Sequence, residues 1–288
     1  MKPAPFEYVV AADVADALAK LAESSDAKVI AGGQSLVPSL NMRLARPERL
    51  VDISRIPGLD RIERDERGWL IIGATATQAA VAAAPIVQAE WPMVAEAISW
   101  IGHPQIRNRG TVCGNLAHHD PSSELPALAT ALGAVLTICG PGGERQVAAA
   151  DFFVSTFETA LEESELLVSV SIPPLSDGVG WGLHEVARRH GDFAIVGAVV
   201  VLVPGDVGRV GSGAVVMFGV GSRPFRSATA EAQLEGEMPT DAAFDLAADA
   251  AASEIDPGSD IHATADDRRA MVRAVVVRSL RSARERMR

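Results

Sequence analysis

The stretch Val29–Leu36, VIAGGQSL, carries the signal that decides the fold. A short β-branched run, which predicts a strand over Lys28–Ile30, leads directly into two glycines, an amide and a hydroxyl. Gly-Gly after a strand marks either a plain tight turn or a place where the backbone approaches another group closely. One loop alone leaves both interpretations open, and a second loop of the same kind elsewhere in the chain would favour a close approach to a ligand.

Length, composition and charge limit the class of protein. The 288 residues suffice for more than one domain, and 48% hydrophobic with 22% charged residues is typical of a globular chain. A net charge of −11 argues against a nucleic-acid binder, which normally carries a basic face. No apolar run reaches the roughly 20 residues of a transmembrane segment, and the opening MKPAPFEYVV lacks the apolar region of a secretion signal. We therefore expect a cytoplasmic protein.

Cysteine is scarce, with only Cys113 and Cys139 and no C-x-x-C motif. This count argues against a disulfide scaffold. It also argues against an iron–sulfur cluster held by this chain alone, because such a cluster normally takes four thiolates.

Hydrophobic patterns predict short helices and strands through the first 175 residues, with Pro173-Pro174 as a candidate boundary. The stretch Gly102–Ser123 is predicted to be a loop. The expected elements are a helix from about Asp13, strands within Arg49–Ile56 and Trp69–Thr77, a helix capped by Thr75 or Thr77, two helices between Ala79 and Ile101 broken near Trp91-Pro92, a helix over Leu125–Leu132, and strands within Ala134–Gly140 and Glu165–Pro174.

Two very apolar segments follow, Phe193–Pro204 and Gly213–Gly221, and then several helices. The last helix should run from about Asp267 to the end with four apolar side chains inward: Val272, Val275, Val276 and Leu280. Its many arginines indicate either a solvated helix face or a docking surface for an acidic partner. The pattern as a whole predicts an α+β architecture of two mixed lobes and a C-terminal sheet-and-helix domain.

A second glycine-rich loop lies at Arg107–Ala127, RNRGTVCGNLAHHDPSSELPA. Neither loop is a G-x-x-x-x-G-K-[ST] phosphate loop or a G-x-G-x-x-G dinucleotide motif. Both nevertheless offer unhindered backbone N–H groups beside small hydroxyl and amide side chains, which is what a diphosphate needs. Two such loops can hold one elongated ligand from two sides, although plain turns remain an equal alternative on spacing alone.

Four motifs together resemble a known family: AGGQSL, the second loop, ELLVSVSIP and RRHGDFA. In this order and spacing they are similar to the FAD-binding medium subunit of molybdenum hydroxylases, especially that of aerobic carbon monoxide dehydrogenase and its relatives. The resemblance covers almost the whole chain. It implies a two-lobed FAD-binding fold of the vanillyl-alcohol oxidase (PCMH) type, with lobes at 1–56 and 57–175. A C-terminal α/β domain of the carbon monoxide dehydrogenase flavoprotein type would then occupy 176–288.

The resemblance also implies which residues bind FAD. The first loop would wrap the diphosphate through backbone N–H groups, and the second loop would complete this cradle. Glu124 would contact the ribityl or adenosine part of FAD, and Leu167 would contact the adenine side. Phe193 would shield the flavin ring. Ile101 would give an apolar contact and His184 a polar one. The implied set is Val29, Ile30, Ala31, Gly32, Gly33, Gln34, Ser35, Leu36, Ile101, Thr111, Cys113, Gly114, Asn115, Glu124, Leu167, His184 and Phe193.

The chain departs from the family pattern at two of these positions. Cys113 stands where T-[IVL]-G-G-[ND] has its first glycine, and a left-handed backbone there would be strained with cysteine. We therefore expect a backbone at 113 that is not left-handed and the closest approach at Gly114. His184 stands where many relatives have lysine. The neighbouring His118 and His119 lack a second ligand group at zinc-like spacing, so we expect no metal site.

The resemblance implies an oxidoreductase subunit that relays electrons. A large subunit oxidises substrate at a molybdopterin centre, a small subunit carries two [2Fe-2S] clusters, and this chain passes their electrons through FAD to an external acceptor. Catalytic residues are then not expected here, and the family assembles as a dimer of heterotrimers. One alternative is a self-contained reductase on the same fold, similar to UDP-N-acetylenolpyruvoylglucosamine reductase. Another is a non-enzymatic module whose glycine loops are only turns.

Overall fold

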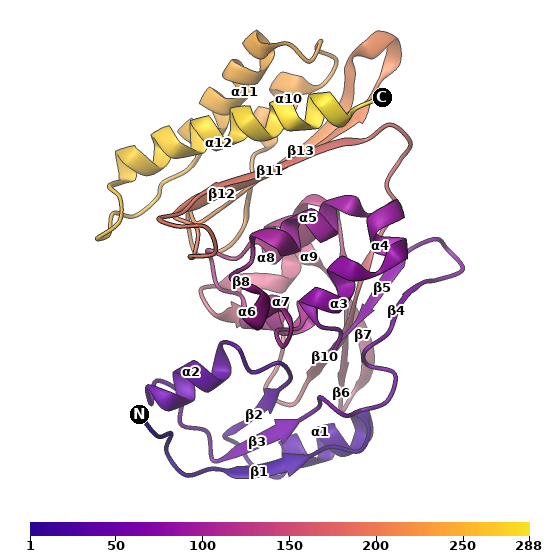
Figure 1. The fold of residues 1–288 in the computed structure, drawn as a ribbon, viewed down its shortest axis with the longest axis vertical. Helices are drawn as coiled ribbons and strands as arrows, with labels where there is room; N and C mark the ends of the chain where they lie inside the picture. Colours follow the sequence, from indigo (N-terminus) through magenta and orange to yellow (C-terminus); the bar gives the residue numbers. More distant parts are fainter.

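The computed structural model describes residues 1–288, which form three regions stacked along the long axis of the molecule (Figure 1). The N-terminal region lies at the bottom of the view, a sheet with its helices forms the middle, and a second sheet with the C-terminal helices forms the top. No helix has the length and apolarity that crossing a membrane requires.

The N-terminal region is a small parallel sheet with two helices. Its strands, in the order β1-β3-β2, are β1 (Glu7–Val10), β2 (Ala27–Ile30) and β3 (Arg49–Asp52), and its helices are α1 (Val14–Ala22) and α2 (Leu36–Asn41). The expected helix near Asp13 is confirmed, since the Asp13 carboxylate caps α1 by accepting from the backbone N–H of Asp16. Because the strands are parallel, the Gly-Gly loop leaves the sheet at the edge where β3 also ends.

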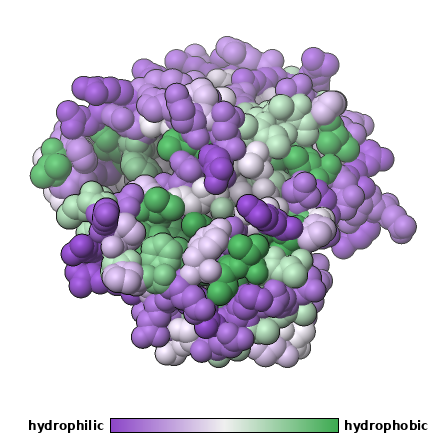
Figure 2. All heavy atoms as spheres, turned by 60° about the horizontal axis from the view of Figure 1, so that its bottom comes forward, coloured by the Kyte–Doolittle hydropathy of each residue, from purple (hydrophilic) through white to green (hydrophobic).

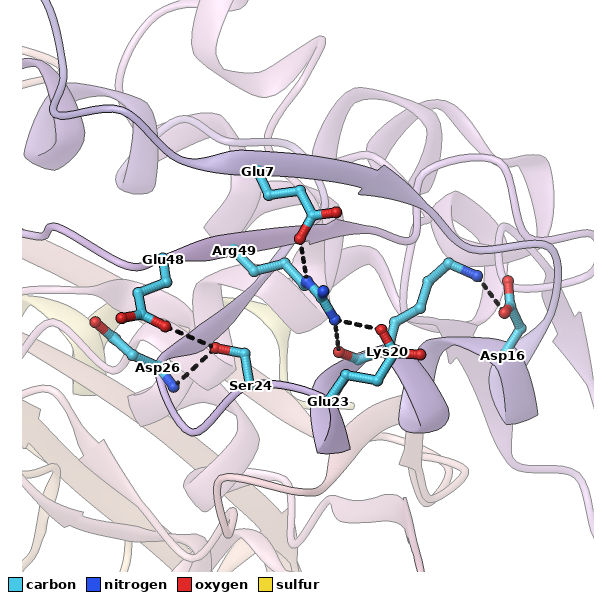
Figure 3. A network of polar contacts seen from close by, with 8 residues as sticks. All are labelled: Glu7, Asp16, Lys20, Glu23, Ser24, Asp26, Glu48 and Arg49. Atoms are coloured by element: carbon cyan, nitrogen blue, oxygen red, sulfur yellow. Dashed lines mark hydrogen bonds and ion pairs between the residues drawn. The ribbon is translucent and has the colours of Figure 1, made fainter.

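Arg49 holds this region together (Figure 3). From the start of the central strand its guanidinium reaches Glu7 on β1 at 2.8 Å and Glu23 after the end of α1 at 2.6 Å. It also donates to the carbonyl of Lys20 at 3.1 Å. One side chain therefore links both neighbouring elements to β3, at the strand end opposite the Gly-Gly loop.

The middle region is an antiparallel sheet in the order β4-β5-β10-β6-β7, accompanied by helices and a two-stranded β8–β9 ribbon. The strands are β4 (Ile62–Arg64), β5 (Leu70–Gly73), β6 (Val135–Gly140), β7 (Gly143–Ala148), β8 (Phe153–Ser155), β9 (Glu158–Thr159) and β10 (Leu166–Ile172). The helices are α3 (Gln78–Ala83), α4 (Pro85–Glu90), α5 (Pro92–Trp100), α6 (Pro104–Arg107), α7 (Val112–His118), α8 (Glu124–Ala131) and α9 (Ala149–Phe152).

Two expectations for this region were wrong. The segment from Ala79 to Ile101 holds three helices, because Pro85 as well as Pro92 begins a new one; proline fits the first turn, whose N–H groups lack helical partners. The stretch Gly102–Ser123 is not only loop, since α6 and α7 lie within it. The predicted strands and the α8 helix are confirmed to within a few residues, and the cap of α3 is Thr77 rather than Thr75.

The C-terminal region is an antiparallel sheet with three helices. Its strands, in sequential order across the sheet, are β11 (Gly180–Val186), β12 (Val196–Pro204), β13 (Val210–Phe218) and β14 (Phe225–Arg226). A short 3-10 turn, η1 (Asp206–Gly208), precedes β13, and the helices are α10 (Ala228–Leu234), α11 (Asp241–Glu254) and α12 (Ala265–Arg286).

This sheet is buried on both faces, which explains its very apolar sequence. Along β12, Val199 and Val201 join the core that extends through the middle region, while Val200 and Leu202 join the core under the helices. Successive side chains of a strand point to opposite faces, so a strand covered on both sides has no polar alternation. Helix α8 of the middle region packs directly on β12 and β13, and this contact joins the two regions.

The last helix, α12, confirms the amphipathic prediction. All four apolar side chains expected to face inward are fully buried. Its arginines mostly pair with carboxylates of this same chain; Arg273, for example, reaches Asp245 at 3.2 Å and also bonds Asp249 on α11. These intramolecular partners favour the solvated amphipathic face over a docking surface for an acidic partner.

Candidate cofactor site

The two glycine loops touch each other through their backbones. A Cβ atom placed on Gly32 would lie 2.1 Å from the carbonyl oxygen of Arg109 and 2.8 Å from the Cα of Gly110. No side chain fits at that distance, so residue 32 has to be glycine for the loops to meet. Residues that are far apart in the sequence thus lie in direct contact in the fold.

The first loop, between β2 and α2, presents unused backbone donors. None of the backbone N–H groups of residues 32–36 donates a hydrogen bond within the chain. Gly33 has φ +70°, a left-handed conformation that turns the loop and lets its carbonyl accept from the N–H of Val37. A run of free N–H groups around such a turn forms an anion-binding nest, which suits a diphosphate.

The second loop is held by side-chain caps at the start of α7. The Thr111 hydroxyl accepts from the N–H of Gly114 at 3.0 Å. A Cβ atom on Gly114 would lie 2.5 Å from that hydroxyl, so the cap itself demands glycine there. The side-chain oxygen of Asn115 accepts from the hydroxyl of Ser123 at 2.8 Å, which links α7 to the residue before α8. The cradle is therefore continuous from the glycine loops to the start of α8.

Cys113 lies inside the helix α7, so the expectation that its backbone is not left-handed is confirmed. Its thiol is buried and contacts the carbonyl of Ile72 on β5 at 3.5 Å. Burial raises the pKa of this thiol to about 12. The side chain thus belongs to the core, and only the backbone of Cys113 is available to a ligand.

The apolar members of the predicted set are buried or partly buried. Ile101 is buried at the end of α5, and Leu167 is buried in β10 opposite Ile138 of β6. Helix α7 packs on β10, so Leu167 and the second loop belong to neighbouring elements. The other apolar members, Val29, Ile30, Ala31 and Leu36, are partly buried where the first loop leaves and re-enters regular structure. Figure 2, which brings the bottom of Figure 1 forward, shows apolar side chains in several patches across the middle of this face, bordered by hydrophilic ones.

A third segment, between β11 and β12, closes onto the end of α5. A Cβ atom on Gly191 would lie 2.8 Å from both the carbonyl oxygen of Gly102 and the ring of His103, so this loop also meets its neighbour through a glycine. Phe193 on the same segment is 72% exposed, although it is an apolar aromatic residue. Exposure of that degree leaves its ring free to cover a ligand.

His184 does not point freely into solvent. Its Nε2 lies 3.0 Å from the hydroxyl of Ser282 on α12, and its ring meets the edge of Trp100, with centroids 6.4 Å apart. Trp100 also meets the ring of His190 at 5.9 Å. Burial lowers the pKa of His184, and the nearby Arg278 lowers it further, so a positive charge replacing that of lysine is disfavoured at neutral pH.

Glu124 opens α8 and is 6% exposed. Burial raises its pKa to about 8, and the neighbouring carboxylates of Glu185 and Asp120 add to the shift. Glu185 was not predicted as a site residue, and burial raises its pKa to about 7. The only sequence signal for it is a carboxylate inside a strand that is otherwise largely apolar.

The two histidines at the end of α7 face different aromatic rings, His118 toward Phe157 and His119 toward Phe153. His119 adopts φ +46° and ends the helix. The structure contains no group of three His, Cys, Asp or Glu side chains arranged to hold a metal ion.

Comparison with known proteins gives matches over the whole chain. The family described as "FAD binding domain in molybdopterin dehydrogenase" matches residues 4–175, and the one described as "CO dehydrogenase flavoprotein C-terminal domain" matches residues 181–283. The 6-hydroxypseudooxynicotine dehydrogenase complex subunit alpha of Paenarthrobacter nicotinovorans is 40% identical, covering 100% of this chain and 97% of its own. The carbon monoxide dehydrogenase medium chain of Hydrogenophaga pseudoflava is 39% identical, covering 98% of each.

Solved structures of related enzymes give the same result. Carbon monoxide dehydrogenase from Hydrogenophaga pseudoflava, in a form lacking the Mo-pyranopterin moiety, superposes with a TM-score of 0.96 at 39% identity and covers 100% of both chains. Quinoline 2-oxidoreductase from Pseudomonas putida 86 superposes with a TM-score of 0.95 at 34% identity, covering 99% of each chain.

Proposed function

This chain belongs to the FAD-binding flavoprotein subunits of the molybdenum hydroxylases, and on this premise we propose that it holds FAD between its two glycine loops. The observation that carries the proposal is the backbone contact of Gly32 with Arg109, beside a run of N–H groups that have no partner in the chain. A side chain at residue 32 would fill the place where the loops meet. The residues present therefore fit a diphosphate-containing cofactor.

Each segment of the site has a distinct task toward FAD. The free N–H groups of the first loop would bind the diphosphate, and the capped turn at Thr111–Asn115 would hold the second loop in place against it. The exposed ring of Phe193 would shield the flavin from water, and Glu124 would bind hydroxyl groups of the cofactor. FAD supplies a redox centre that accepts two electrons and releases them singly or together.

The chain is thus an oxidoreductase subunit that receives electrons from [2Fe-2S] clusters of a partner subunit and passes them through FAD to an external acceptor. Its relatives belong to complexes named for different substrates, including carbon monoxide, nicotine and caffeine, and are 35–39% identical to this chain over nearly its full length. Similar flavoprotein subunits therefore occur in complexes that act on different substrates. This fits oxidation of the substrate at a molybdopterin centre on another subunit. These relatives favour the electron relay over a self-contained reductase of the same fold.

The same reasoning extends to assembly. We infer a complex with a large molybdopterin-binding subunit and a small [2Fe-2S] subunit, arranged as a dimer of heterotrimers in the cytoplasm. Sedimentation of the co-expressed complex tests the stoichiometry, and cell fractionation tests the location. The proposed division of the chain at 56/57 and 175/176 is tested by limited proteolysis, which should cut near these points before it cuts within the lobes.

The site assignment is tested by blocking the loops. Gly33→Val places a β-branched residue at φ +70°, and Gly114→Val places one against the Thr111 hydroxyl. Each variant should lose FAD from the purified complex, measured as flavin absorbance per chain. Gly142→Val is the matched control, since a Cβ atom there meets nothing within 4 Å. Normal flavin content in both loop variants would refute the assignment of the loops.

A further inference from the structure

Three segments around the cofactor cradle carry positive charge in a chain that is acidic overall. They are residues 29–47 with the first glycine loop, 101–119 with the second, and 187–191 in the third segment. None of them contains an aspartate or a glutamate, although the chain has 37 such residues and a net charge of −11. Together they carry six arginines, which we call the arginine collar: Arg43, Arg46, Arg107, Arg109, Arg188 and Arg189.

The three segments lie in direct contact, so the collar belongs to one part of the molecule. A Cβ atom on Gly32 would lie 2.1 Å from the carbonyl oxygen of Arg109, which joins the first and second segments. A Cβ atom on Gly191 would lie 2.8 Å from the carbonyl oxygen of Gly102, which joins the second and third. Helices α2 and α6, which belong to the first two segments, lie on the same side of the molecule (Figure 1).

The collar arginines have no carboxylate partners within the chain. None of the six forms an ion pair, whereas most of the other basic residues do. Arg43 and Arg107 donate to backbone carbonyl oxygens instead. All except Arg107 are exposed. In this respect the collar differs from the arginines of α12, and its charge is available to another molecule.

The cofactor accounts for only part of this charge. The first loop already offers a diphosphate a run of free backbone N–H groups. One diphosphate is also too small to pair with arginines that come from three separate segments. Because five of the six side chains are exposed, positive charge extends beyond the cradle to the surface around it.

Exposed apolar side chains accompany the collar. Met42 and Leu44 flank Arg43 and are 59% and 77% exposed, and the exposed ring of Phe193 follows the collar in the third segment. Arg43 itself adopts φ +60°, a left-handed conformation that is uncommon for a residue with a Cβ atom and is concentrated at functional sites. Arginine, methionine and aromatic side chains are enriched at protein–protein interfaces. This composition therefore fits a partner protein better than a small ligand.

We propose that the arginine collar, with Met42, Leu44 and Phe193, is the surface on which the [2Fe-2S] subunit docks through an acidic face. The inference rests on the proposed function. A protein that donates electrons to FAD has to dock beside the cofactor, and the collar surrounds the cradle. Apolar side chains exposed at the same place favour a lasting partner over an acceptor that binds and diffuses away. The charge also sets the orientation, because the rest of this acidic chain repels an acidic face.

The first test is modification of arginines with phenylglyoxal, measured by mass spectrometry on the native complex and on the full chain alone. Arg109, Arg188 and Arg189 should react in the free chain and lose this reactivity in the complex. Arg67 and Arg209 are exposed, lack carboxylate partners and lie outside the collar, so they should react equally in both. The co-expressed pair of this chain and the [2Fe-2S] subunit should protect the collar as the whole complex does.

These outcomes separate the inference from the FAD assignment. A complex that holds no flavin refutes the FAD assignment, whereas protection of the collar is measured independently and should persist in a flavin-depleted complex. Collar arginines that stay reactive in a flavin-containing complex refute the docking surface. Protection that appears only when the large subunit or an electron acceptor is present refutes the [2Fe-2S] subunit as the occupant.

The second test reverses the charge. Arg188→Glu/Arg189→Glu should raise the dissociation constant for the [2Fe-2S] subunit by about tenfold at low salt. The difference from wild type should shrink near 1 M salt, where the screening length falls to about 3 Å. Arg67→Glu/Arg209→Glu makes the same change in net charge outside the collar and is the matched control.

An unchanged dissociation constant in the collar variant, or an equal loss of affinity in the control, refutes the acidic face. If the double variant does not fold, Arg109→Glu applies the same test from the second segment, since its exposed side chain has no contact with a carboxylate. An unchanged dissociation constant in that variant refutes the inference equally.

Discussion

Gly32→Ala should weaken FAD binding more than any other single methyl group added to the loops. The new Cβ would lie 2.1 Å from the Arg109 carbonyl oxygen, whereas ordinary contact begins at 3.4 Å, so the loops would have to part by the difference. Over-packing of this kind costs about 1–3 kcal/mol, which corresponds to about 5- to 150-fold in the dissociation constant if the cost falls on the bound state.

The assay is titration of the flavin-depleted full chain with FAD, followed by quenching of flavin fluorescence. Gly142→Ala is the matched control because its added methyl group meets nothing within 4 Å, and it should bind as wild type. Melting temperatures of the three proteins show whether the cost falls on folding instead. Wild-type affinity in Gly32→Ala, with unchanged stability, would refute the conclusion that the cradle depends on backbone contact between the loops.

Three further predictions concern a carboxyl with a raised pKa, a buried thiol and an ion pair between two regions of the chain. Glu124 has a pKa of about 8 in the fold against an ordinary 4.5, so the free energy of unfolding should fall as pH rises from 4.5 through 8, and Glu124→Gln should flatten that curve in denaturant titrations. Cys113 is sealed in the core, so a thiol reagent should label only the partly exposed Cys139 in native protein and both in denaturant; rapid native labelling of two thiols would contradict this. Arg286 of the C-terminal region forms an ion pair with Glu96 of the middle region at 2.9 Å. Arg286→Ala should therefore lower the free energy of unfolding, measured in urea, by about 1 kcal/mol.

The sequence predicts well whatever depends on local pattern. The apolar segments that form β12 and β13, the inward face of α12 and the position of α1 can all be predicted from spacing, because burial imposes a period on the chain. Helix α7 is missed for the opposite reason. Its Cys113, Gly114 and Asn115 are weak helix formers, and the Thr111 cap and packing hold the helix instead.

In the candidate site, too, local features could be predicted from the sequence and long-range contacts could not. Both glycine loops are visible in the sequence, since glycine next to small polar residues has a local meaning. Their contact through Gly32 and Arg109 is not, because it depends on how lobes far apart in the sequence come together. The burial of Glu185 is missed likewise, since only the fold shows that its Oε2 atom is enclosed without a hydrogen-bond partner.

The most direct test of the central claim is the visible absorption spectrum of the purified full chain after gel filtration, recorded alone, with added FAD, and in the co-expressed complex. If FAD is held between the two glycine loops, a flavin band should elute with the protein in the complex and be lost in Gly33→Val. A complex that assembles with its partners but carries no flavin, even with FAD in excess, would contradict it.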